Sequence, residues 1–166
     1  DNPNVIAGQG TAVLEFMEHV GEPESNWWES RGIVRDITLG EFDALITPVG
    51  GGGLLAGTCI AARATQPNCR LFGAEPIGAD DAARSLIAGE LIPQTDPDTI
   101  CDGLLTSLGE LTWPILRDHL ASIITVDDDT VRRAMRLLRD ELGLLVEPSG
   151  AIGFAATLSP GFASDA

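Results

Sequence analysis

Four consecutive glycines at positions 50–53 are the part of the sequence most suited to holding a ligand. They follow an apolar run and precede an Ala- and Leu-rich run that begins at Leu54. Glycine has no Cβ, so its backbone can approach a bound group closely and can adopt positive φ angles. Successive N–H groups in such a loop, with those at the start of a following helix, favour an anion. The pattern therefore predicts a phosphate site formed by Gly50, Gly51, Gly52, Gly53 and Leu54.

The glycine run by itself is compatible with three interpretations. Two glycines would suffice for a tight turn between a strand and a helix. Gly51, Gly53 and Ala56 fit the G-x-G-x-x-G/A pattern of dinucleotide sites, and Glu75 stands where such sites place a ribose-binding acid. A cofactor with one terminal phosphate would use the same loop, so the glycines leave the choice of ligand open.

The chain contains no side-chain amine, because all ten of its cationic residues are arginine. A reaction that starts with a Schiff base needs a lysine, since no other side chain supplies the primary amine. If the phosphate compound takes part in such chemistry, the reacting amine has to come from polypeptide outside these 166 residues.

Composition narrows the class of protein. The length of 166 residues suits one α/β domain, and the net charge of −15 argues against nucleic acid and anionic membrane surfaces as partners. No apolar run approaches the ~20 residues of a membrane-spanning helix. Cys59, Cys69 and Cys101 lack metal-ligand spacing, and we expect them to be ordinary core or surface residues of a cytoplasmic protein.

The elements around the glycines predict a parallel sheet. Short apolar runs at 42–49 and 69–76 are typical of buried strands, and the small-residue run 54–65 between them is typical of a helix. Strand, glycine loop, helix and strand in this order form a βαβ unit, which implies a parallel α/β arrangement. A third strand is predicted at 122–126.

Further helices are predicted outside this unit. The clearest, 127–143, has an Asp cap and stops at Gly143. A helix at 11–20 follows Gly8 and Gly10 and has Thr11 as its expected cap. The polar, Gly- and Pro-containing residues 21–41 are expected to be a loop insertion. The remaining predicted helices lie at 80–90 and 111–120, and a strand or turn leads into another at 144–158.

Five segments in one order resemble a known family. They are VIAGQGT (5–11), TPVGGGGLLAG (47–57), GAEP followed by ADD (73–81), DGLLTSLGELTWPILRD (102–118) and VEPSGA (146–151). Together they resemble the serine/threonine dehydratase and serine racemase family, pyridoxal-phosphate (PLP) enzymes of the tryptophan-synthase-β fold type. The resemblance covers almost everything except 21–41. It implies a three-layer αβα fold with a mostly parallel sheet, in which residues 1–166 are one incomplete PLP-binding domain, part of the larger domain of that fold.

The resemblance also implies two sites. Gly50–Gly53 and Leu54 would bind the phosphate of pyridoxal 5'-phosphate, and Gly103 and Glu147 would lie beside its ring. The carboxylates of Glu75 and Asp81, with the carbonyl of Ala79, would bind a divalent cation, and such oxygen ligands suit Mg²⁺ or Ca²⁺. The alternative for these acids is structural: Glu75 would cap a strand, and Asp80 or Asp81 would cap the next helix.

The activity that the resemblance implies is that of an ammonia-lyase on β-hydroxy amino acids, converting serine or threonine to a keto acid and ammonia. Serine racemase and hydroxyaspartate dehydratase activities of the same family are the alternatives. From other classes, a dinucleotide-binding module and a non-catalytic phosphate-binding pseudo-enzyme remain open. The family's Schiff-base lysine and its C-terminal Gly-rich segment are expected outside this chain, so the chain alone is expected to be an inactive fragment of a homodimeric enzyme with a small amino-acid substrate.

Overall fold

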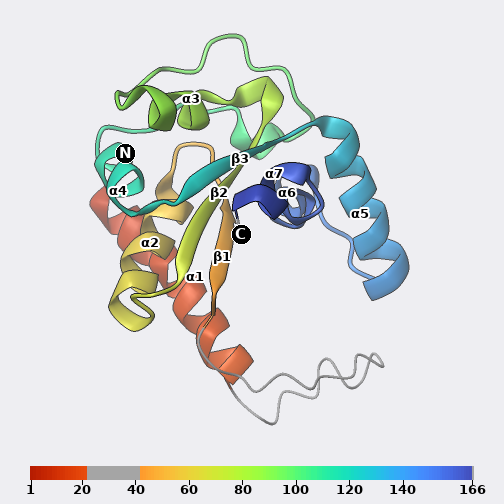
Figure 1. Ribbon diagram of the computed structural model, residues 1–166, viewed down its shortest axis with the longest axis horizontal. Coiled ribbons are helices and arrows are strands. Elements are labelled where there is room, and N and C mark those ends of the chain that lie inside the picture. Colours follow the sequence, from red (N-terminus) through yellow and green to blue (C-terminus); the bar gives the residue numbers. More distant parts are fainter. Residues whose placement is uncertain (22–41, 166) are drawn as a thin grey trace.

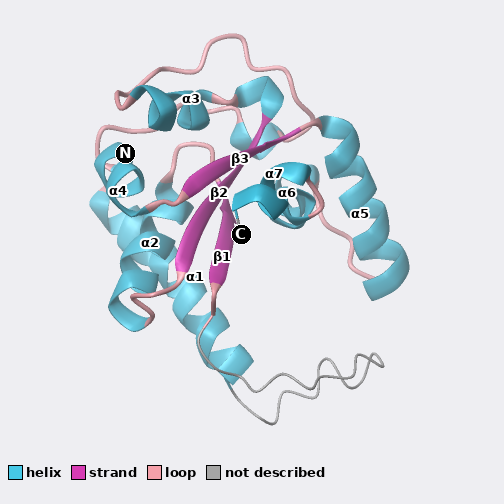
Figure 2. Ribbon diagram, viewed as in Figure 1, coloured by secondary structure: helices cyan, strands magenta, loops and turns pink. Residues whose placement is uncertain are grey.

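A three-stranded parallel sheet forms the centre of the computed structural model, which describes residues 1–21 and 42–165 (Figure 1). The strand order is β1-β2-β3, and each strand runs in the same direction as the one beside it (Figure 2). This confirms the three predicted strands and their parallel arrangement. Their bounds are β1 Ala44–Pro48, β2 Arg70–Pro76 and β3 Ser122–Val126.

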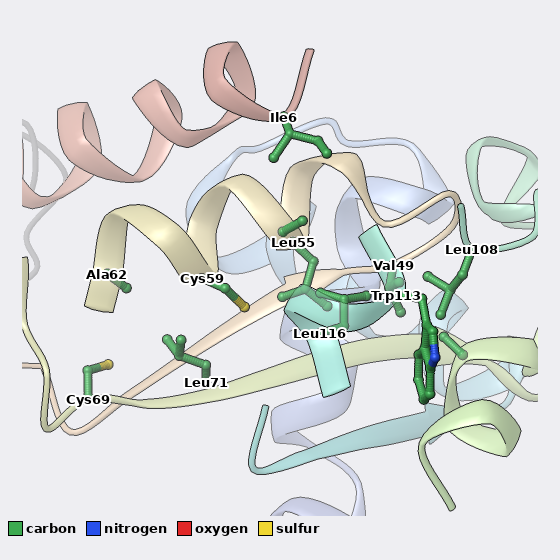
Figure 3. Packing of buried hydrophobic residues seen from close by; sticks show 12 residues of the cluster. Ile6, Val49, Leu55, Cys59, Ala62, Cys69, Leu71, Leu108, Trp113 and Leu116 are labelled. Atoms are coloured by element: carbon green, nitrogen blue, oxygen red, sulfur yellow. The ribbon is translucent and has the colours of Figure 1, made fainter. Parts of the chain in front are cut away.

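One face of the sheet is covered by three helices: α1 Pro3–Gly21, α2 Gly53–Thr65 and α4 Thr112–His119. Apolar side chains from α2, β2 and α4, among them Leu55, Leu71 and Leu116, form the core on this side (Figure 3). Helices α1 and α2 touch backbone to backbone, since a Cβ on Gly57 would lie 2.5 Å from the amide nitrogen of Gly10. Glycine is required there by close approach.

The opposite face is covered by α5 Asp128–Leu142, α6 Pro148–Thr157 and α7 Pro160–Asp165 (Figure 1). A second core lies between them and the sheet, built from residues such as Phe72, Ile124, Val131 and Ile152. Helices on both faces make the three-layer αβα arrangement that the resemblance implied. The strand sequences are continuous apolar runs because both faces of the sheet are buried.

The ends of α5 match the sequence-based expectation. The side chain of Asp127 accepts a hydrogen bond from the amide of Thr130, which satisfies one of the free N–H groups of the first turn. Gly143 ends the helix with a φ of +65°, a left-handed conformation that glycine adopts without strain.

The start of α1 was predicted wrongly. The helix begins at Pro3, so Gly8, Gly10 and Thr11 lie inside it, and the Thr11 hydroxyl donates to the carbonyl of Gly8 instead of capping an end. Its first turns are held by packing on α2, which overrides the low helix propensity of the glycines. Of the predicted insertion 21–41, Gly21 ends α1 and the rest lies outside the described residues.

The connections on the carboxyl side of the sheet complete the fold. They are the 3-10 turns η2 Ile77–Ala79 and η3 Asp102–Leu104, with the helix α3 Asp81–Ala88. The segment before α6 is neither strand nor helix. All three cysteines are buried free thiols, as expected for core residues. None of the helices described in residues 1–21 and 42–165 combines the length and apolarity that crossing a membrane requires.

Candidate cofactor and cation sites

The glycine loop lies at the carboxyl end of β1 and leads directly into α2. The last backbone bond to the neighbouring strand is donated by Val49 to the carbonyl of Ala74. Gly52 then turns the chain with a φ of +80°, and the first backbone bond of α2 runs from Ala56 to the carbonyl of Gly52. No side chain caps this helix within the described residues. The N–H groups of its first turn therefore have no side-chain acceptor, which leaves them available to an anion.

The loop is glycine-rich because other segments pack against it. A Cβ on Gly52 would lie 2.9 Å from both Leu108 and the side chain of Thr112, and a Cβ on Gly50 would lie 3.1 Å from Leu104. At Gly53, by contrast, the nearest atom to a Cβ would be a methyl of Val5 at 4.0 Å. The loop is thus closely backed on one side and open at the start of α2, which is the shape of a cradle for a phosphate.

Two hydroxyls that sequence reasoning did not single out as phosphate-loop supports hold this cradle in place. The buried hydroxyl of Thr112, at the start of α4, donates to the carbonyl of Gly51 (3.0 Å) and accepts from the amide of Gly109 (2.9 Å). The hydroxyl of Ser149 accepts from the amide of Gly103 (3.0 Å). Thr112 lies within the family-like segment 102–118, but its role depends on a contact 61 residues away.

Of the two residues expected beside the cofactor ring, Gly103 is brought next to the glycine loop. Its carbonyl oxygen would lie 3.3 Å from a Cβ on Gly50. Glu147 is the residue that precedes α6, two positions before Ser149, and its side chain makes no hydrogen bond to the loop among the described contacts. The roles of both residues toward a ring stay predictions.

Glu75 is fully buried at the end of β2 and caps α3. Its two carboxylate oxygens accept from the amides of Ala82 (3.0 Å) and Ala83 (2.8 Å). Burial raises the pKa of Glu75 to about 8, although these two hydrogen bonds oppose the rise. The structural alternative expected Asp80 or Asp81 to cap this helix, but Glu75 does so. Asp80 precedes the helix without a side-chain cap and pairs with Arg84 instead.

Asp81 is the second fully buried acid, and one of its oxygens has no partner. Oδ2 accepts from the amide of Leu108 (3.0 Å), whereas Oδ1 is buried with no hydrogen bond. Burial raises the pKa of Asp81 as well. A buried, unpartnered carboxylate oxygen is costly unless a cation or proton satisfies it. Ala79 is buried two residues earlier, in η2.

These oxygen donors fit a hard divalent cation better than a transition metal. No group of three or more His, Cys, Asp or Glu side chains suited to a metal occurs among the described residues, so a cation here needs backbone carbonyl or water ligands too. Such mixed oxygen sets are what Mg²⁺ and Ca²⁺ take. The unpartnered Oδ1 of Asp81 is the observation that fits a cation at this place.

The same geometry argues against a dinucleotide. In that interpretation the carboxylate of Glu75 would bind a ribose hydroxyl. Here it is fully buried, and both oxygens are occupied by amides of α3. A ribose hydroxyl of a ligand at the glycine loop would have to enter this buried place, whereas a small cation could use the second lone pair that each oxygen keeps.

Comparison with known proteins identifies the kind of fold and cofactor. The family model described as "Pyridoxal-phosphate dependent enzyme" matches residues 1–165. The chain is 46% identical to a serine racemase of Dictyostelium discoideum, over 98% of the chain and 45% of that protein. It superposes on maize serine racemase with a TM-score of 0.84 at 42% identity, covering 99% of the chain and 46% of that structure.

A solved T.th. threonine deaminase is also similar, with a TM-score of 0.80 and 42% identity over 98% of the chain and 54% of that structure. The chain therefore spans about half the length of the proteins that it matches. The tryptophan-synthase-β-like fold and pyridoxal phosphate as cofactor, both implied by the sequence resemblance, are confirmed.

Proposed function

Because the chain belongs to the family of pyridoxal-phosphate-dependent enzymes, we propose that it is the phosphate-binding part of a serine racemase. The observation that carries this choice is the 46% identity to a serine racemase along almost the whole chain. It favours serine racemase over the serine/threonine dehydratase activity that the family resemblance implied. Dehydration of serine or threonine is the second candidate, supported by the similar threonine deaminase structure.

The residues of this chain would bind and position the cofactor. The N–H groups of Gly51, Gly52 and Gly53 and the first turn of α2 would hold its phosphate. Thr112 keeps the loop in shape through the Gly51 carbonyl, and Ser149 fixes Gly103 against it. When bound, pyridoxal phosphate supplies an electron sink for removal of the α-proton of an amino acid.

The proton transfer itself needs a group that this chain lacks. It has no lysine, and neither the loop nor the residues that back it contribute a side chain of suitable basicity. We propose that the lysine comes from another part of the complete protein, and that the 166-residue chain alone is inactive. Formation of D-serine or keto acid by this chain alone would contradict the proposal.

The cation site would stabilise the start of α3. Glu75, the carbonyl of Ala79 and Asp81 are the proposed ligands, with Mg²⁺ or Ca²⁺ as the ion. Such an ion would satisfy Asp81 Oδ1 and offset the burial of two carboxylates. Through Leu108, whose amide binds Asp81 and whose side chain backs Gly52, the ion would also support the glycine loop.

The complete protein, loaded with pyridoxal phosphate, tests the activity. We expect D-serine from L-serine, measured by chiral chromatography, together with slower keto-acid formation. Threonine and hydroxyaspartate, assayed in parallel for keto-acid products, separate the alternatives. Keto acid without D-serine would replace the racemase by the dehydratase. Light scattering of the same preparation tests the further proposal of a homodimer.

A further inference from the structure

The side chain of Asp1 covers the turn that leads into α4. The amide of Leu111 donates to Asp1 Oδ2 at 2.5 Å, a contact between residues 110 positions apart. A Cβ on Gly109 would collide with the carboxyl group of Asp1, at 2.5 Å from each of its oxygens. The carboxylate therefore occupies the space that a side chain at position 109 would fill, and glycine is required there while Asp1 keeps this place.

This carboxylate supplies a cap that α4 lacks in its own sequence. Leu111 is the residue before the helix and has no polar side chain to cap it, and the first turn of α4 contains no acid. In a capping box, a carboxylate accepts from the amide of the residue before the helix, and negative charge there interacts favourably with the helix dipole. Asp1 makes the same kind of contact from a distant part of the chain.

Asp1 is held in place because the start of α1 is itself well ordered by hydrogen bonds. The side chain of Asn2 accepts from the amide of Asn4 at 2.8 Å. The carbonyl of Asn2 accepts from the amides of Val5 and Ile6, both at 3.1 Å. Figure 1 shows the N-terminal end of the chain beside α4. The carboxylate of Asp1 thus joins the starts of two helices that pack against α2.

The turn under Asp1 is also the support of the phosphate loop. The buried hydroxyl of Thr112 donates to the carbonyl of Gly51 and accepts from the amide of Gly109. The Asp1 carboxylate lies against the α-carbon of Gly109 and binds the amide of Leu111. Asp1 and Thr112 therefore hold the same turn from two sides, and a shift of that turn would move the hydroxyl that binds the loop.

Two other roles for Asp1 fit these contacts less well. A carboxylate in direct contact with the cofactor phosphate would repel it, since both groups are anions. A role confined to α4 would leave the phosphate loop unaffected, yet the first residue of α4 is Thr112, which binds Gly51. The contacts favour an indirect role in which Asp1 acts on the loop through the turn.

We propose that Asp1 is a positioning residue for the phosphate of pyridoxal phosphate. Its carboxylate fixes residues 109–111, so that the carbonyl of Gly51 stays bound to Thr112 and the amides of the glycine loop remain available to the phosphate. Asp1 itself does not touch the cofactor. This role depends on pyridoxal phosphate as the cofactor and is the same for a racemase and a dehydratase.

Binding of pyridoxal phosphate to the complete protein, without any amino acid, tests this role. Asp1→Ala removes the acceptor and should weaken binding about 5-fold in a fluorescence titration, and it should move the phosphorus NMR resonance of the bound phosphate. Asp1→Asn keeps an acceptor oxygen and should stay within about 2-fold of wild type. Asp118→Ala is the control, because it removes a carboxylate from the last turn of α4, where that carboxylate pairs with Arg117 at 2.8 Å. It should change neither measurement.

A second variant tests the contact between Asp1 and Gly109 itself. In Gly109→Ala the new methyl displaces the carboxylate, so binding should weaken about 5-fold or more. In the double variant Asp1→Ala, Gly109→Ala the collision is absent, and the affinity should equal that of Asp1→Ala alone. Two residues that did not touch would instead give losses that add.

Three results would overturn the proposal. The first is an unchanged affinity and an unchanged resonance in Asp1→Ala, and the second is additive losses in the double variant. The third is an equal loss in Asp1→Asn and Asp1→Ala, which would mean that the charge of Asp1 acts on the cofactor directly. Urea unfolding of each apoprotein identifies a variant that fails to fold. None of these measurements needs turnover of an amino acid, so the proposed racemase activity is tested separately.

Discussion

The glycine loop and the acidic pair Glu75 and Asp81 are both candidate sites at the carboxyl ends of strands, yet they are built in opposite ways. The loop offers backbone N–H groups. Its glycines have no Cβ, and this allows Leu108 and Thr112 to pack directly against its backbone. Glu75 and Asp81 offer buried side-chain oxygens, three of which already accept hydrogen bonds from the protein. A backbone site can be recognised from residue types in a row, whereas a side-chain site depends on which neighbours use the same atoms.

The largest effect should follow from a side chain at Gly52. In Gly52→Val, the new Cβ meets Leu108 and Thr112 at 2.9 Å and the residue is held at a φ of +80°. Left-handed strain and overpacking together cost about 2–4 kcal/mol. We expect a matching loss of stability and about 100-fold weaker binding of pyridoxal phosphate, measured by fluorescence titration of the complete protein.

Gly53→Ala is the matched control for this prediction. It adds a Cβ one residue further on, where the nearest atom is 4.0 Å away. Stability should fall much less than in Gly52→Val, since alanine suits a helix start without a positive φ, whereas cofactor affinity should still fall because the new methyl enters the open side of the cradle. An equal loss of stability in the two variants would mean that packing behind Gly52 is not the cause.

The acidic pair should make the free energy of unfolding depend on pH. Since burial raises the pKa of Glu75 to about 8, the folded state holds a proton there that the unfolded state releases near pH 4.5. Without divalent cation, this group therefore makes stability fall as pH rises between about 4.5 and 8, by at most about 1.4 kcal/mol per pH unit. Urea unfolding in EDTA across this range measures it.

Glu75→Gln isolates that contribution, because it removes the titrating group and keeps one acceptor for the amides of α3. The difference in unfolding free energy between wild type and variant should depend on pH in EDTA and much less in excess Mg²⁺ or Ca²⁺. A difference that does not change with pH would show that Glu75 stays charged in the folded state without a cation.

Thr112→Val weakens the glycine loop without changing any residue of the loop, because it removes only the hydroxyl that supports Gly51. It therefore tests whether the backbone site depends on a distant side chain. The replacement keeps the shape and removes the hydroxyl that binds Gly51 and Gly109. Buried groups left without a partner cost about 1–3 kcal/mol. We expect a loss of this size in thermal unfolding and roughly 10-fold weaker cofactor binding. Thr112→Ser, which restores the hydroxyl, should recover most of the affinity.

The smallest effect is expected for Ser149→Ala. It leaves the amide of Gly103 without its acceptor at 3.0 Å, in a place where water can partly replace the hydroxyl. The cost should be about 1 kcal/mol or less in stability, with little change in affinity for the phosphate. A loss as large as that of Thr112→Val would assign Ser149 a direct contact with the cofactor.

Local features of the sequence predicted most of the fold. The strands 42–49, 69–76 and 122–126 are apolar runs bounded by turn residues, and the structure places strands in all three. The helix after Asp127 carries its start and stop signals in its own residues. The prediction of the start of α1 failed because Gly8 and Gly10 are poor helix formers. Their helical conformation depends on the packing of Gly10 against Gly57.

The sequence by itself determined the parallel α/β arrangement and the glycine loop, and its lack of lysine led to the proposal that a Schiff-base amine comes from elsewhere. These properties follow from residue types and short spacings, which act through the local backbone. Only the tertiary structure decided that Glu75 caps α3 in place of Asp80, that Asp81 keeps one oxygen unpartnered, and that Thr112 supports Gly51. Each of these depends on which distant groups share one buried space, and burial sets both the cost of an unpaired atom and the direction of a pKa shift.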